Sequence, residues 1–114
     1  MNISIPKSDK KYFWTQHCVG KIFQYGIGPN KIKRIINYPD RREEGIAENT
    51  IAVMKQKSKK DPLKGEEWVM YQLRKKRKVV ISVWFYPGVT PEGKKIFIPD
   101  DVWEEINNSR EYKL

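Results

Sequence analysis

Two strongly apolar segments lie next to each other in the chain, with only five residues between them. Residues 67–73 (EWVMYQL) and 79–86 (VVISVWFY) are rich in β-branched and aromatic side chains and are too short for typical helices, so both are predicted to be β-strands. The five residues between them are all lysine or arginine. A connection this short joins antiparallel neighbours, since parallel strands need a long crossover. Any fold for this chain is therefore built around a β-hairpin with a basic tip.

In the first part of the chain the apolar residues recur with the period of an α-helix. A helix is expected to begin after Thr15 as N-cap and to end at Gly26, because the apolar residues between them fall at i, i+3 and i+4: Val19, Ile22 and Phe23. A second helix is expected between Pro29 and Pro39, where the same spacing recurs: Ile32, Ile35 and Ile36. Since only residues 26–28 separate the two, a tight helical hairpin is predicted.

The remaining segments complete an α+β chain. Residues 50–56 (TIAVMKQ) predict a third strand, residues 11–14 an edge strand or lead-in, and residues 41–45 a charged loop. Pro99 opens a last helix. The fold class expected is α+β, with a helical hairpin packed on a three- to four-stranded antiparallel sheet and a C-terminal helix. Residues 1–114 are expected to form a single domain, with residues 1–10 flexible.

The charge of the chain points to a polyanionic partner. Lysine and arginine number 23 against 14 aspartate and glutamate, a net charge of +9, and the surplus is concentrated in the predicted sheet and its turns. Such a surplus favours nucleic acid as the partner. No apolar stretch of membrane-spanning length and no secretory signal are present, so no membrane partner is expected. A lone cysteine, Cys18, fits a cytoplasmic location.

The candidate nucleic-acid contacts lie in the basic tip and in the connection before it. We expect them to form one continuous basic rim with three further lysines of that connection, Lys59, Lys60 and Lys64. The rim residues expected to contact nucleic acid are Arg74, Lys75, Lys76, Arg77, Lys78, Lys55 and Lys57. Strand alternation places Trp84 and Tyr86 on one face with Ser82, and the other face has Val79, Ile81, Val83 and Phe85. If the aliphatic residues face the helices, these rings lie on an open face, where Trp84 can stack on an unpaired base. The alternative is that both rings belong to the core.

The candidate catalytic residues are His17 and Tyr86. A histidine ordinarily titrates near neutrality, so His17 can act as a general acid or base, and the alternative is a surface or capping role. One histidine and one cysteine cannot supply a usual tetrahedral zinc site, and no nucleotide-binding glycine motif is present. We therefore expect no metal and no cofactor.

One stretch resembles a known group of proteins. Residues 17–27 (HCVGKIFQYGI), the second helix ending at Pro39 and the strand residues 80–83 (VISV) resemble a small bacterial family of uncharacterised domains, related in pattern to the RelE/BrnT-like toxins of toxin–antitoxin systems. The resemblance covers roughly residues 12–86. It implies a RelE-like sheet that cradles mRNA on the ribosome, with basic and tyrosine side chains that perform metal-independent cleavage. His17 and Lys21 match the helix motif, whereas residues 84–86 (WFY) replace the arginine-rich strand ending of such toxins.

The leading hypothesis is an RNA-binding RelE-like domain that acts as a metal-independent ribonuclease toxin if it cleaves. Its expected partners are RNA or ribosome-associated RNA and an acidic antitoxin protein. In a second hypothesis the chain is a non-enzymatic adaptor whose basic sheet is covered by an acidic protein. In a third, residues 15–38 bind duplex DNA as a pair of helices with a short turn.

Overall fold

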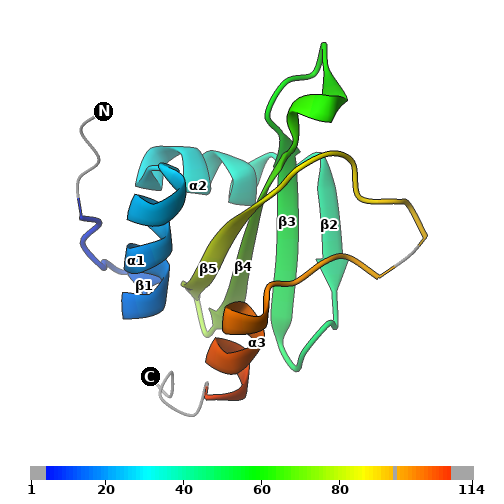
Figure 1. The fold of residues 1–114 in the computed structure, drawn as a ribbon. Helices are drawn as coiled ribbons and strands as arrows, with labels where there is room; N and C mark the ends of the chain where they lie inside the picture. The colour runs from blue at the N-terminus through cyan, green and yellow to red at the C-terminus, as the bar shows by residue number, and fades with distance from the viewer. Residues whose placement is uncertain (1–4, 94, 109–114) are drawn as a thin grey trace.

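The computed structural model describes residues 5–93 and 95–108. Its elements, in chain order, are β1 (Tyr12–Trp14), α1 (Gln16–Tyr25), α2 (Pro29–Asn37), β2 (Arg41–Glu44), β3 (Thr50–Gln56), the short 3-10 helix η1 (Pro62–Lys64), β4 (Glu66–Arg74), β5 (Arg77–Tyr86) and α3 (Asp100–Asn107) (Figure 1). The mixed α+β class and the C-terminal helix are confirmed. The described helices also begin and end where the sequence indicates, because Thr15 caps α1 by accepting from the Cys18 amide at 3.0 Å and Gly26 ends it at φ 67°.

The sheet has five strands in the order β1-β5-β4-β3-β2. Strands β2 to β5 are antiparallel neighbours, whereas β1 pairs parallel to β5. The prediction of a purely antiparallel sheet of three or four strands is therefore wrong. The charged loop expected at residues 41–45 is in fact the edge strand β2. Its side chains alternate between half-buried and exposed, so it has no apolar alternation that would reveal a strand.

Helices α1 and α2 pack on the same face of the sheet but against different strands. Helix α1 packs on β5, and α2 lies across β3 and β4. Figure 1 shows the two helices running in different directions, so the tight helical hairpin is not confirmed. The left-handed backbone of Gly26 and the following turn send the chain across the sheet instead of back along α1.

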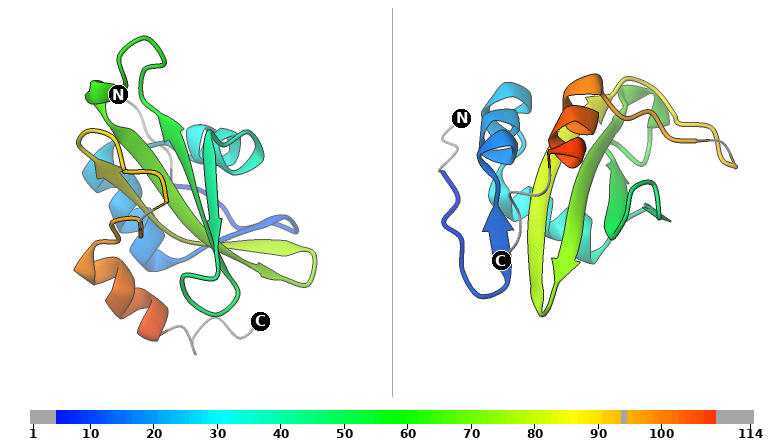
Figure 2. Two further views of the ribbon diagram at one scale, coloured as in Figure 1. Left: turned by 90° about the vertical axis from the view of Figure 1, so that its right-hand side faces the viewer. Right: turned by 90° about the horizontal axis from the view of Figure 1, so that it is seen from below.

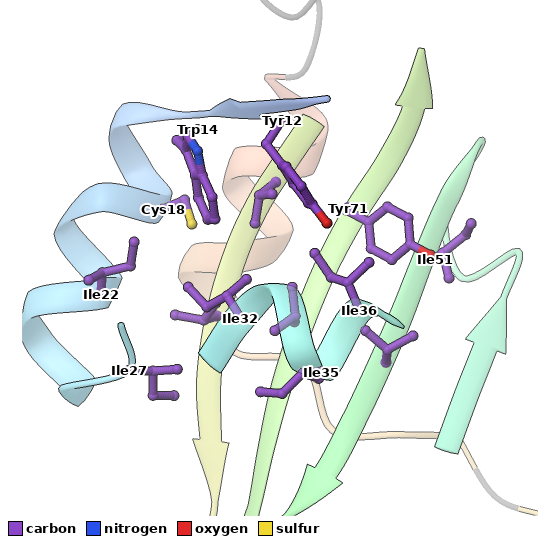
Figure 3. Packing of buried hydrophobic residues seen from close by; sticks show 14 residues of the cluster. Tyr12, Trp14, Cys18, Ile22, Ile27, Ile32, Ile35, Ile36, Ile51 and Tyr71 are labelled. Atoms are coloured by element: carbon purple, nitrogen blue, oxygen red, sulfur yellow. The ribbon is translucent and has the colours of Figure 1, made fainter. Parts of the chain in front are cut away.

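Both faces of the sheet are covered, and each has its own hydrophobic core. The core beneath α1 and α2 contains Tyr12, Trp14 and the isoleucines of the helices (Figure 3). The opposite face is covered by α3 and by residues 87–93 and 95–98, which we call the arm (Figure 2). No helix in the described ranges has the length and apolar composition needed to cross a membrane.

An irregularity in the β4–β5 pairing assigns the β5 side chains to these two cores. Met70 pairs with Ser82 but Tyr71 pairs with Val80, so Ile81 is an extra residue in β5. As a result Ile81 shares the arm-side core with Trp84, while Val80 lies in the core beneath the helices. The predicted alternation, which placed Ile81 and Trp84 on opposite faces, is wrong because it assumed an unbroken ladder.

Candidate nucleic-acid interface

The basic tip, Arg74–Lys78, lies at one end of the sheet, where β4 turns into β5 (Figure 1). Arg74 pairs with Arg77 across the hairpin, and the two lysines between them are exposed. Lys75 has φ 58°, in the left-handed region that a residue with a Cβ adopts at a cost. The tip therefore projects lysine ammonium groups into solvent at the end of a two-residue turn.

Beside the tip is a concave pocket of about 540 Å³, which we call the lysine pocket. It lies between the residues leading into β1, helix α2, and the start of β5 with its turn. Its lining residues are Asp9, Lys11, Tyr12, Lys33, Asn37, Lys76 and Lys78. The sequence predicted Lys76 and Lys78 as contacts. It indicated Lys33 only as a phosphate contact of the duplex-DNA hypothesis, and it gave no reason to include Lys11. The parallel pairing of β1 with β5 is what brings Lys11 to Lys78, whose backbone N–H donates to the Lys11 carbonyl at 2.8 Å.

Two of the pocket's lysine ammonium groups lie against the ring of Tyr12. The Nζ atoms of Lys33 and Lys78 lie 5.1 and 5.6 Å from its centroid. The negative face of an aromatic ring attracts cations at this distance, which offsets part of the repulsion between the two lysines. The Tyr12 hydroxyl accepts a hydrogen bond from Nδ2 of Asn37 at 3.4 Å, which ties β1 to the end of α2.

One carboxylate, Asp9, lines the lysine pocket, and its single charge offsets only part of the charge of the four lysines. Oδ1 of Asp9 accepts from the backbone amides of Tyr12 and Lys11, both at 2.8 Å. These hydrogen bonds, first that from Tyr12, lower the pKa of Asp9. In the part of the chain that the structure describes, none of the four pocket lysines forms an ion pair. The pocket is therefore positively charged at neutral pH.

The prediction of one continuous basic rim is wrong. Lys55 and Lys57 lie at the opposite end of the sheet, because Gln56 pairs with the first residue of β4 while the basic tip follows its last. From Glu67, the partner of Lys55, to Arg74 are seven residue steps of β4, about 23 Å. Lys55 donates to the carbonyl oxygen of Tyr38 at 3.0 Å, and Nζ of Lys57 lies 5.4 Å from the ring centroid of Phe85.

The prediction that Trp84 lies on an open face of the sheet is also wrong. Its side chain is fully buried and stacks on Trp68, with ring centroids 6.0 Å apart and planes 4° apart. The arm and α3 cover this pair, so the alternative of a core role is confirmed for Trp84. Tyr86 is half-buried against Phe97 of the arm and lies at the end of β5 away from the tip. Neither Trp84 nor Tyr86 is beside the basic tip, so neither ring can stack on a base that is bound there.

His17 lies at the junction of α1, β5 and α3. Its Nε2 is 2.9 Å from Oγ of Ser82, a fully buried side chain. Desolvation lowers the pKa of His17, against the effect of the Glu105 and Asp101 carboxylates on α3, which raise it. Asp101 itself pairs with Lys21. Ser82 and Tyr86 are four residues apart on β5, about 13 Å, so the two candidate catalytic residues are not brought together.

Among the family models, curated proteins and solved structures compared with the chain, none matches it. The resemblance to RelE-like toxins therefore stays a prediction. The chemistry of the lysine pocket and the basic tip is what indicates a function.

Proposed function

We propose that this domain binds RNA through its phosphate groups, with the lysine pocket as the main contact and the basic tip beside it. The observation that carries the proposal is the convergence of four lysines on one concave pocket with no carboxylate paired to them within the described residues. A polyphosphate that enters such a site releases its own counterions, which favours binding.

The pocket is suited to phosphate more than to bases. Its donors are ammonium groups on flexible stems, which bind phosphate oxygens as point charges and do not read base edges. The aromatic ring within it, Tyr12, is buried with lysines against it and offers no free face for stacking. We therefore propose binding with little dependence on base sequence.

We propose binding without cleavage. Attack by a ribose 2′-hydroxyl needs a base and a cation close to the same phosphate. His17 contacts Ser82 in the middle of β5, Tyr86 ends that strand, and the lysine pocket is at its beginning. The groups that a ribonuclease toxin would combine are thus spread along one strand.

The test compares two variants that each remove two positive charges. In Lys33→Gln/Lys78→Gln the charges come from the lysine pocket, and in Lys59→Gln/Lys60→Gln they come from two exposed lysines between β3 and η1. Binding of a labelled single-stranded RNA is followed by fluorescence anisotropy across a salt series. We expect the pocket variant to lose affinity and to reduce the slope of log K against log salt by about 1.4, since each single-strand phosphate contact contributes roughly 0.7.

The matched control is expected to bind with nearly the slope of the unmodified protein. An affinity that does not change with salt, or an equal loss in the two variants, contradicts binding at the lysine pocket. The RNA recovered after incubation is expected to be intact on a denaturing gel. Discrete fragments that vanish in His17→Ala or Tyr86→Phe would establish the ribonuclease instead.

A further inference from the structure

We propose that the lysine pocket binds the terminal phosphate of an RNA strand in preference to the phosphodiesters within it. The inference rests on the proposed RNA binding and names the group that the pocket selects. An end phosphate differs from an internal one in shape and in charge, and the pocket has features that match both differences.

The first feature is concavity. Residues before and in β1 form one wall, α2 contributes Lys33 and Asn37 on another, and the start of β5 with its turn supplies Lys76 and Lys78. An internal phosphate carries a nucleoside on each side, which hinders its entry into a recess. A terminal phosphate has one free side and can enter first. The volume of about 540 Å³ falls within the range of about 300–1,000 Å³ of small-ligand pockets, so it has room for a phosphate with its nucleoside.

The second feature is the number of lysines that line one pocket. A phosphomonoester carries a charge of about −1.5 to −2 at neutral pH and three acceptor oxygens, against one charge and two free oxygens for a diester. Each ammonium group has three N–H donors. Lys33 and Lys78 share the ring of Tyr12, and Lys11 and Lys76 complete the lining. The extra charge of the monoester therefore gains attraction from several lysines at once.

The charge of the ligand gives this preference a pH dependence. The second proton of a phosphomonoester binds with a pKa of about 6, so below that pH the terminal phosphate has the same single charge as a diester. The Asp9 carboxylate, with its lowered pKa, stays ionised throughout this window. The other charged groups at the site are cations: Lys11, Lys33, Lys76, Lys78 and the neighbouring Arg77. The preference for a terminal phosphate is expected to weaken as the pH falls through about 6.

The experiment uses one RNA sequence in three forms: with a 5′-phosphate, with a 3′-phosphate, and with hydroxyl groups at both ends. Affinities of the full chain are measured by anisotropy at about 50 mM salt, where electrostatic differences are large. At about pH 7.5 we expect one phosphorylated form, or both, to bind roughly tenfold more tightly than the hydroxyl form. At about pH 5.5 the ratio is expected to fall to roughly two. The 5′ and 3′ forms show which end the pocket accepts.

The variants separate this inference from the function on which it rests. Lys33→Gln/Lys78→Gln is expected to abolish the preference, and Lys59→Gln/Lys60→Gln to keep it, with circular dichroism to verify that both are folded. Equal affinity for the three RNA forms overturns the terminal-phosphate inference while RNA binding stands. A ratio that does not change with pH also overturns it. Failure of all three forms to bind overturns the proposed function itself.

Discussion

Gly65 joins η1 to β4 in a backbone conformation that suits only glycine. Its φ is 108°, and an added Cβ would meet the ring of Phe85 and come within 2.9 Å of the Tyr86 carbonyl oxygen. We expect Gly65→Ala to lower the free energy of unfolding by about 2–4 kcal/mol, from backbone strain together with overpacking. Urea denaturation measures the loss.

Gly88 is the matched control for this substitution. It has a similar φ of 111°, but an added Cβ there would meet nothing within 4 Å. Gly88→Ala is expected to cost only the strain, about 1–2 kcal/mol. An equal cost at the two positions would show that the contact with β5 does not matter.

At the level of elements, the arm is held to the sheet by one buried carboxylate. Glu66 is 1% exposed, and it accepts hydrogen bonds from Nε1 of Trp68 at 3.0 Å and from the Thr90 amide at 3.1 Å. It also accepts from the Thr90 hydroxyl. Arg41 of β2 donates to the Thr90 carbonyl at 3.2 Å. These contacts hold the arm over the stacked Trp68 and Trp84.

Loss of the Thr90 hydroxyl is expected to loosen the arm. Thr90→Val keeps the shape of the side chain but leaves the Glu66 carboxylate one donor short, which we expect to cost about 1–3 kcal/mol. Acrylamide quenching of tryptophan fluorescence is expected to increase, because the arm shields two of the four tryptophans. Thr90→Ser restores the donor and is expected to recover the protection. If Thr90→Ser behaves like Thr90→Val, the hydroxyl is not what holds the arm.

Elements with a regular apolar period could be predicted from the sequence, and those without one could not. The strands at residues 50–56, 67–73 and 79–86 were predicted within a few residues, because β-branched and aromatic side chains fill them. Strand β2 was missed because an edge strand with charged side chains has no such signal. The extra residue in β5, Ile81, was missed because the sequence of one strand does not show which residues of the neighbouring strand it pairs with.

At the level of the whole molecule, the candidate site was predicted only in part. The two lysine-rich segments before and after β4 are near each other in sequence. They lie far apart in the structure because β4 is extended, so its full length separates them. The lysines that do gather beside the tip come from the first third of the chain, Lys11 and Lys33. Only the strand order brings them there, and one sequence does not contain the strand order explicitly.

The two layers that cover the sheet meet at His17, and this makes stability depend on pH. Burial lowers the folded-state pKa of His17, so a proton binds more tightly to the unfolded chain, where the value is about 6.5. The stability that neutral His17 contributes is present above this pH and is lost as the pH falls below it toward the folded-state pKa. We expect the melting temperature to decline between about pH 7 and 5, and His17→Gln to flatten this decline.

Asp101 of α3 can be compared with His17 in the same measurement of melting temperature against pH. The pKa of Asp101 is lowered from 3.8, with desolvation opposing the effect of the Lys21 hydrogen bond and charge. Its own contribution is therefore lost only in more acidic solution. Because its carboxylate also raises the pKa of His17, Asp101→Asn is expected to make the fall in melting temperature between about pH 7 and 5 somewhat larger. Parallel profiles for the unmodified protein and His17→Gln would contradict a role for the histidine.

Pairing of β1 with β5 has a consequence for synthesis. Tyr12 and Lys78 are neighbours in the sheet, although translation must add dozens of residues between them. Contacts this distant in sequence form late in folding. A nascent chain that has exposed Lys11 and Lys33 still lacks the half of the pocket that β5 and its turn supply. The growing polypeptide thus completes the proposed phosphate site only when the β4–β5 hairpin has been synthesised.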